Sequence, residues 1–329
     1  MAGAGRERAV PPVASRWVPD GMRGAAPGAP TGDTGSVDSG DWRAQRRAER
    51  VLRRIDRDVR RRSGRGAGPL LGLLAAVAVV AFAGVVAVGS EWDVGAWLRP
   101  RAYVEVDGQP VAVPRPEASD GRLLPAVAAT TEGAHAFLHT DDDGAPIGYD
   151  PCRPIRFVVR PDGMPASGQA LLDEAMAGVS AASGLVFEYA GTTDEAPAVE
   201  RTLIQPDRYG EGWAPVLIAW SDEAQMPELA GEVAGLGGSA AVPGASGQGS
   251  WLAAGRVVLD TADVLVMLAR PDGHQQARAI AMHELAHVLG LDHVTDPDEL
   301  MNPMSSNRTN LGPGDLQGLA LVGQVACEG

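Results

Sequence analysis

Three histidines and one glutamate lie close together near the C-terminal end of the chain, in the run HELAHVLGLDH at residues 283–293. Residues four apart lie on the same face of a helix, so His283 and His287 can direct imidazole nitrogens at one metal ion. A catalytic zinc ion is typically held by three protein ligands and one water. We expect His293 to supply the third ligand.

His293 cannot reach this ion if the helix simply continues. Six residues beyond His287, a helix of 3.6 residues per turn has rotated the side-chain direction by about 240° net. The helix must therefore end between the two histidines. Gly290 stands where a left-handed C-terminal turn would bring the chain back toward the metal.

Glu284 follows His283 directly, which places its carboxylate near a metal-bound water rather than on the metal. Zinc lowers the pKa of its water to near ~7, and a carboxylate within hydrogen-bond distance can take the proton and pass it to a leaving amine. The run therefore predicts zinc-dependent hydrolysis of peptide bonds, with Glu284 as the general base.

The run matches every fixed position of the metzincin signature H-E-x-x-H-x-x-G-x-x-H. Met301 follows His293 by eight residues, and the sequence LMNP around it resembles the methionine turn of the matrixin branch. That resemblance implies that Met301 lies beneath the three imidazoles. Val294 and Asn302 replace the serine and the aromatic residue that matrixins usually carry, so the ligands are kept while the substrate pocket differs.

Other functions are compatible with the same residues. A lone H-E-x-x-H also occurs as a histidine pair in an amphipathic helix, and a zinc site can persist in a protein without catalysis. The first alternative is a catalytically silent, zinc-containing binding or scaffold module on the cell surface. The second is a zinc hydrolase that acts on non-peptide amides.

The first third of the 329-residue chain does not have the composition of a globular domain. Residues 1–40 are rich in Gly, Ala, Pro, Ser and Asp, which predicts a disordered tail. Residues 41–65 hold eleven arginines interleaved with apolar residues at spacings of three and four, the pattern of a basic amphipathic helix. Residues 66–90 carry no charge and are long enough to cross a ~30 Å hydrocarbon layer.

These segments predict a single-pass membrane protein. Positive residues accumulate on the cytoplasmic side, so the arginines place the N-terminus in the cytoplasm and the later domain outside the cell. The basic segment would also contact anionic membrane lipid. A cleavable signal peptide is the alternative for residues 66–90, but the 65 residues before the apolar run are far more than a usual signal peptide has.

The charge of the chain bears on its partners. The formal net charge is −14, and the acidic residues are concentrated after residue 91. An acidic external domain argues against a nucleic acid partner. The expected partner is a peptide or protein substrate, and the acidic field would either favour basic peptides or only keep the domain soluble.

Residues 91–133 are interpreted as an extracellular stalk or a pro-segment. Trp92 and Trp97 fit a membrane-interface belt, and the prolines between residues 109 and 116 fit a stiff spacer. Within this segment, residues 104–113 predict a short strand pair around Asp107-Gly108.

Residues 134–329 are predicted to form the zinc peptidase domain, which is long enough to bury a substantial core. Periodicity predicts strands at 155–160, 186–189, 216–220 and 257–260, and helices at 167–183 and from about 273. This order is similar to a metzincin domain, which implies an α+β fold with a twisted mixed sheet, an active-site helix and a C-terminal helix near 311–323. Residues 235–249 are either the edge strand along which substrate lies in matrixins or a flexible loop.

Cys152 and Cys327 are the two cysteines of the chain. Outside the cell, a pair in one domain most simply forms a disulfide. The alternative is that the Cys152 thiolate occupies the zinc ion, as the cysteine switch of matrixin pro-segments does. The flanking sequence DPCRP lacks that switch motif, which favours the disulfide.

Overall fold

The computed structural model describes residues 13–16, 101–304 and 308–329, and for residues 13–16 it describes the backbone alone. All of these residues belong to one compact unit. The predicted basic segment at 41–65 and the predicted membrane anchor at 66–90 lie outside the described residues. Among the residues that are described, no helix is long and apolar enough to cross a membrane.

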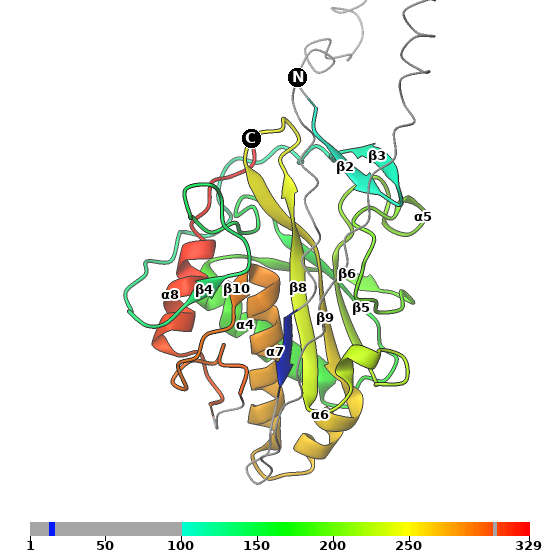
Figure 1. Ribbon diagram of the computed structural model, residues 1–329, viewed down its shortest axis with the longest axis vertical. Helices are drawn as coiled ribbons and strands as arrows, with labels where there is room; N and C mark the ends of the chain where they lie inside the picture. Colours follow the sequence, from blue (N-terminus) through cyan, green and yellow to red (C-terminus); the bar gives the residue numbers. More distant parts are fainter. Residues whose placement is uncertain (1–12, 17–100, 305–307) are drawn as a thin grey trace, which may run out of the picture. The chain divides into compact units, whose positions relative to one another are not determined.

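A six-stranded sheet runs through the unit in the order β1-β8-β9-β7-β5-β6 (Figure 1). Strands β5, β6, β7 and β9 are parallel, whereas β8 is antiparallel to β9 and β1 is antiparallel to β8. The strands are β1 Val13–Arg16, β5 Ile155–Val159, β6 Phe187–Thr192, β7 Val216–Ser221, β8 Val233–Pro243 and β9 Ser250–Asp260. The mixed α+β fold expected from the sequence is confirmed.

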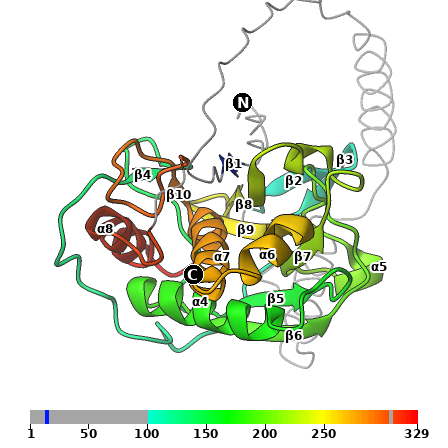
Figure 2. The ribbon, with the colours of Figure 1, turned by 90° about the horizontal axis from the view of Figure 1, so that it is seen from below.

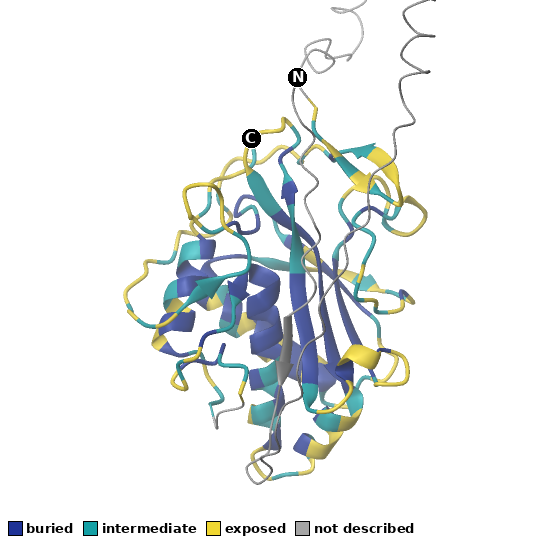
Figure 3. Ribbon diagram, in the orientation of Figure 1, coloured by how far each residue is buried: buried dark blue, intermediate teal, exposed yellow. Residues whose placement is uncertain are grey.

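Helices α4, α6, α7 and α8 form a layer on one face of this sheet (Figure 2). They are α4 Gly168–Ser183, α6 Thr261–Leu268, α7 Gly273–Leu289 and α8 Pro313–Val322. The short helix α5 Pro206–Tyr209 and the 3-10 turn η1 Pro227–Leu229 pack on the other face. The apolar sides of α4, α7 and α8 share one core with β5, β7 and β9, which contains Leu172, Ile218, Val257, Leu285 and Leu319. Figure 3 shows buried residues filling this layer between helices and sheet.

The central strands are buried on both faces because the second face of the sheet is also covered. Every residue of β7 is buried. Val158, Leu217 and Ala219 point away from the helices and pack with Tyr209 from the segment between β6 and β7. In the same segment, Arg201 forms a buried ion pair with Glu195, with Nε 2.7 Å from Oε1. Parallel strands that are covered on both faces have nearly continuous apolar sequences, as β7 does.

Two N-terminal regions contact the domain in ways that the sequence did not predict. The described part of the predicted stalk or pro-segment lies against the domain: Arg122 donates to the carbonyl of Gly323 at 2.7 Å, and the Leu123 N–H donates to the carbonyl of Pro151 at 3.1 Å. Within it, β2 Tyr103–Val106 and β3 Gln109–Ala112 form the predicted hairpin. The predicted disordered tail includes β1, whose pairing with β8 supplies hydrogen bonds that its composition does not reveal.

The glycine-rich region before Trp251 is mostly a strand, second from the edge of the sheet next to β1, rather than a flexible loop. Most of this region belongs to β8. Strand β9 begins at Ser250, seven residues before residue 257, where the apolar sequence predicts its start.

The sequence did not predict helix α6. Asp260 caps its first turn by accepting from the N–H of Asp263 at 2.9 Å, and only Val264 and Met267 of this helix are buried.

A disulfide joins Cys152 to Cys327, with 5.6 Å between their Cα atoms and 175 residues between them in sequence. It connects the residues just before β5 to the segment after α8. Cys152 is therefore not a candidate zinc ligand, because its sulfur is bonded to another sulfur.

We predict that replacing both cysteines by serine lowers the free energy of unfolding by about 2–5 kcal/mol, because the bridge restricts a long loop in the unfolded chain. Calorimetric melting of the two proteins in the same buffer measures this difference. Alkylation of two free thiols in the native, unreduced protein would contradict the bridge itself.

Candidate metal centre

Helix α7 ends where the sequence required it to end. Gly290 adopts a left-handed conformation, with φ of 113°, and its N–H donates to the carbonyls of Ala286 and His287. The chain then forms β10 Leu291–Asp292, which pairs with β4 Ala136–Phe137. This pairing fixes the direction in which the chain returns, and His293 follows it.

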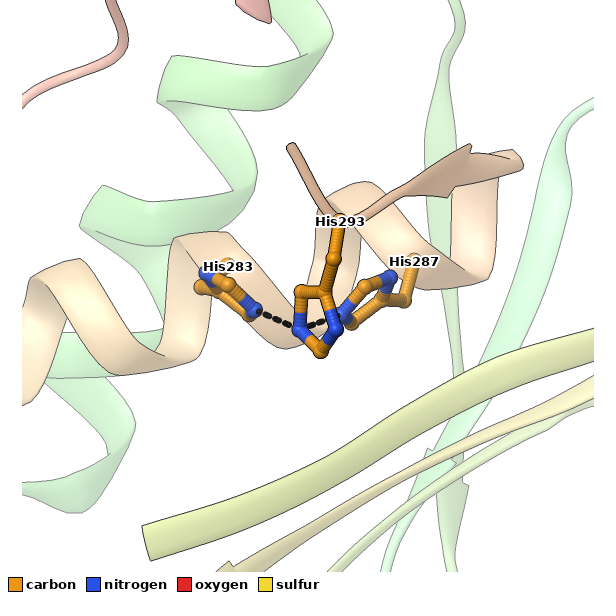
Figure 4. A group of neighbouring side chains, drawn as sticks. All are labelled: His283, His287 and His293. Carbon is orange, nitrogen blue, oxygen red and sulfur yellow. Dashed lines mark hydrogen bonds between the residues drawn. The ribbon is translucent and has the colours of Figure 1, made fainter. Parts of the chain in front are cut away.

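The three predicted ligands come together on one side of α7 (Figure 4). Nε2 of His293 lies 3.1 Å from Nε2 of His283 and 3.1 Å from Nε2 of His287. One ring nitrogen from each histidine lies within 4.8 Å of the others. His283 and His287 are buried, and His293 is half-buried.

Backbone carbonyls orient two of the rings. Nδ1 of His283 lies 2.7 Å from the carbonyl oxygen of Leu300, and Nδ1 of His287 lies 2.8 Å from that of Leu291. A carbonyl accepts only, so each Nδ1 must carry the hydrogen and donate it. Each Nε2 is therefore left with its lone pair facing the other rings.

Burial keeps these rings neutral. It lowers the pKa of His283 to about 3 and holds the pKa of His287 well below the ordinary value of 6.5. Burial also lowers the pKa of His293, although the nearby carboxylate of Asp292 acts in the opposite direction. Neutral imidazole is the form that binds metal ions.

The donor set fits a zinc ion. Nε2 of His293 can donate at most one hydrogen, so it can satisfy the lone pair of His283 or that of His287 but not both. A cation at the centre satisfies the Nε2 lone pairs of all three rings. Bonds of about 2.0–2.1 Å at tetrahedral angles place ligand nitrogens about 3.3 Å apart, close to the observed 3.1 Å. Three imidazoles with no thiolate or carboxylate among them are typical of a catalytic rather than a structural zinc site.

Glu284 is fully buried between α7 and β8. The space it occupies lies against the backbone of Gly235, because a Cβ built on that glycine would be 2.8 Å from Glu284 Cγ and 3.0 Å from Oε1. The carboxylate therefore lies beside β8, and it belongs to the residue that directly follows the first histidine in the helix.

Met301 is buried in the main core, and the turn that carries it is tied to α8. Asp315 accepts from the N–H groups of Leu300, Met301 and Gly312, at 2.5, 3.2 and 2.7 Å. Glu299 accepts from the N–H groups of Gly314 and Asp315, at 2.8 and 3.0 Å. These bonds fix the peptide whose carbonyl orients His283.

The remaining histidines have partners away from this centre. His135 contacts the carbonyl of Gly133, and His139 contacts the carbonyl of Ser239. His274 contacts the carboxylate of Glu174.

Asp292 is half-buried and accepts from the backbone N–H of His293 at 2.7 Å, so it helps to shape the turn that carries the third ring.

Asp315 and Glu299 were not singled out from the sequence, although a signal for Asp315 exists. It is the third residue of α8, where an acidic side chain commonly accepts from the N–H of the residue that caps the helix. Glu299 carries no such local signal, because its partners are 15 and 16 residues away.

Comparison with known proteins agrees with this geometry. Residues 218–321 match the family model of the matrixin peptidases, a range that contains β8, the three histidines, Glu284 and the methionine turn. None of the curated proteins matches.

Solved structures add little. One that matches, described as the GM1 bound form of the ECX AB5 holotoxin, is 15% identical with a TM-score of 0.28, and the match covers 48% of this chain and 61% of that one. The chain thus spans less than two thirds of that protein. By the family match, residues 218–321 are similar to the matrixin metallopeptidases.

Proposed function

We propose that the protein is a membrane-anchored, extracellular zinc endopeptidase. The observation that carries this proposal is the convergence of three neutral imidazoles, in which Nε2 of His293 lies 3.1 Å from Nε2 of His283 and of His287. Glu284 directly follows His283 in the same helix. When bound, zinc would polarise a peptide carbonyl and make water acidic enough to act as a nucleophile near neutral pH. His283, His287 and His293 would hold the ion.

The protein's own groups have distinct roles in this proposal. The carbonyls of Leu300 and Leu291 accept hydrogen bonds from Nδ1 of His283 and His287, which keeps each ring hydrogen on Nδ1. Glu284 takes a proton from the attacking water and delivers it to the nitrogen of the leaving amine. Met301 fills the core beneath the turn that returns to the site.

The edge of the sheet supports a peptide as the substrate. β8 is 11 residues long, and one edge is bonded to β9. On its other edge it pairs with an extended segment, β1, over Val233 to Gly237. An extended substrate would take the place of β1 on this side of β8 and form the same backbone hydrogen bonds.

The membrane location is supported by the sequence. Residues 66–90 are uncharged and follow an arginine-rich segment, which favours an anchor with the N-terminus in the cytoplasm. The disulfide between Cys152 and Cys327 favours an oxidising compartment for the domain.

The second candidate function is a zinc-containing binding module without catalysis. It is favoured by the same histidine geometry, because ligands alone do not require turnover. The two proposals differ at Glu284, which a binding module does not need.

We predict that Glu284→Gln lowers kcat/KM for peptide cleavage by about 10²–10⁴-fold, because the neutral amide cannot accept the proton. The zinc content of the purified chain should stay the same as that of the unaltered protein. Cleavage assays with a peptide library and elemental analysis of zinc measure the two effects. Equal cleavage by the two proteins would remove the basis of the endopeptidase assignment.

We predict that His293→Ala weakens zinc binding by at least about 10-fold, because one of three protein ligands is lost. His274→Ala is the matched control, since His274 contacts Glu174 away from the site and its loss should leave zinc affinity unchanged. Competition with a chromophoric chelator measures both constants. Equal affinity of the two variants would exclude His293 as a ligand.

We predict that zinc affinity changes by less than about twofold between pH 7.5 and 6.5. Three imidazoles with the ordinary pKa of about 6.5 would lose about sixfold over this range by protonation. Burial lowers the pKa of all three rings here, so protons compete less with the metal across this window. Chelator competition at the two pH values measures the ratio, and a sixfold loss would show that the rings titrate normally.

A further inference from the structure

The face of β8 that meets α7 carries glycine where other strands carry side chains. Residues at alternate positions of a strand share a face, so Gly235, Gly237 and Ser239 point the same way. Leu236 points to the opposite face, where it packs with Val258 and Met226. Ser239 contacts the helix directly, because its Oγ donates to the carbonyl of Val288 at 2.8 Å.

Gly235 and Gly237 both lie against Glu284, but against different atoms. A Cβ at position 235 would lie 2.8, 3.0 and 3.0 Å from Cγ, Cδ and Oε1 of the glutamate. A Cβ at position 237 would lie 2.3 Å from its backbone oxygen and 2.9 Å from its carbonyl carbon and Cα. Carbon atoms that are not bonded to each other pack at about 3.5–4.0 Å, so each added methyl group would displace what it meets.

The consequences of the two displacements differ. At position 235 the atoms met belong to a side chain, which would rotate and carry the carboxylate away from its place. At position 237 they belong to the main chain of α7, so the helix itself would have to move away from the strand.

We propose that Gly235 is a positioning residue for the general base: its missing Cβ leaves the space in which the Glu284 carboxylate stands, and Gly237 brings the helix close enough for that space to matter. This inference rests on the proposed function of Glu284. Both glycines act through the glutamate.

The test is a set of variants of the full chain: Gly235→Ala, Glu284→Ala and the double variant, with the corresponding pair for Gly237→Ala. Gly212→Ala is the matched control, because Gly212 is exposed and a Cβ there has no atom within 4 Å. Melting temperature, zinc content, kcat and KM are measured for each protein.

Gly235→Ala should lower the melting temperature by about 2–6 °C in the parent protein, the usual effect of overpacking. In the Glu284→Ala background the same change should cost less than about 1 °C, because the atoms that the new methyl group meets are gone. Gly237→Ala should cost the same in both backgrounds, because the main chain of residue 284 remains.

Kinetics test the catalytic consequence. Gly235→Ala should lower kcat by about 10–100-fold, because a small misplacement of a reacting group has an effect of this size, while KM stays within about twofold. Zinc content should equal that of Gly212→Ala. A merely structural role would lower stability and zinc content together and would not depend on Glu284.

Two results would overturn the inference: an equal melting cost of Gly235→Ala with and without the Glu284 side chain, or a kcat within about twofold of the Gly212→Ala control. A parent protein that cleaves no peptide would contradict the proposed function instead. In that case the melting temperatures alone still decide whether Gly235 sets the place of the glutamate.

Discussion

The site depends on hydrogen bonds from two imidazole Nδ1 atoms to backbone carbonyls. The carbonyls of Leu300 and Leu291 accept hydrogen bonds from Nδ1 of His283 and His287, which keeps the ring hydrogens on Nδ1. The Nε2 atoms are then free of hydrogen and face one another as acceptors. Without these bonds, the rings could rotate or change tautomer, and no common point for a cation would exist. Burial adds to the effect, because it disfavours the protonated, charged form of each ring.

Those carbonyls belong to segments that the rest of the fold has to place. Leu291 begins β10, which is paired with β4, and Leu300 lies in the turn whose N–H groups are bound by Asp315. Glu299 of this turn and Asp315 of α8 are almost completely buried, and both accept hydrogen bonds from backbone N–H groups. Burial raises the pKa of Asp315, although the backbone donors act against this rise. Helix α8 therefore serves the site through its first turn, far from any metal ligand in sequence.

The sheet contributes to the site in a different way, through the close packing of β8 on α7 rather than through hydrogen bonds to the histidines. The glycines of β8 let α7 approach until main chain meets main chain, and the Ser239 bond to Val288 fixes the same pair of elements further along. The edge on which a peptide could lie and the helix that carries the glutamate are thus held as one unit. The family match over residues 218–321 covers these two elements together with the methionine turn.

The sequence alone predicted which histidines come together, because their spacing is local: helical periodicity places His283 beside His287, and Gly290 can adopt the left-handed turn that brings His293 back. It also predicted the pairing of Cys152 with Cys327. Tertiary structure alone decided the role of Asp315 and Glu299, the packing of residues 101–133 on the domain, and the contact of Gly235 with Glu284. These features join residues far apart in sequence, and no local periodicity or spacing encodes which distant backbone a side chain will meet.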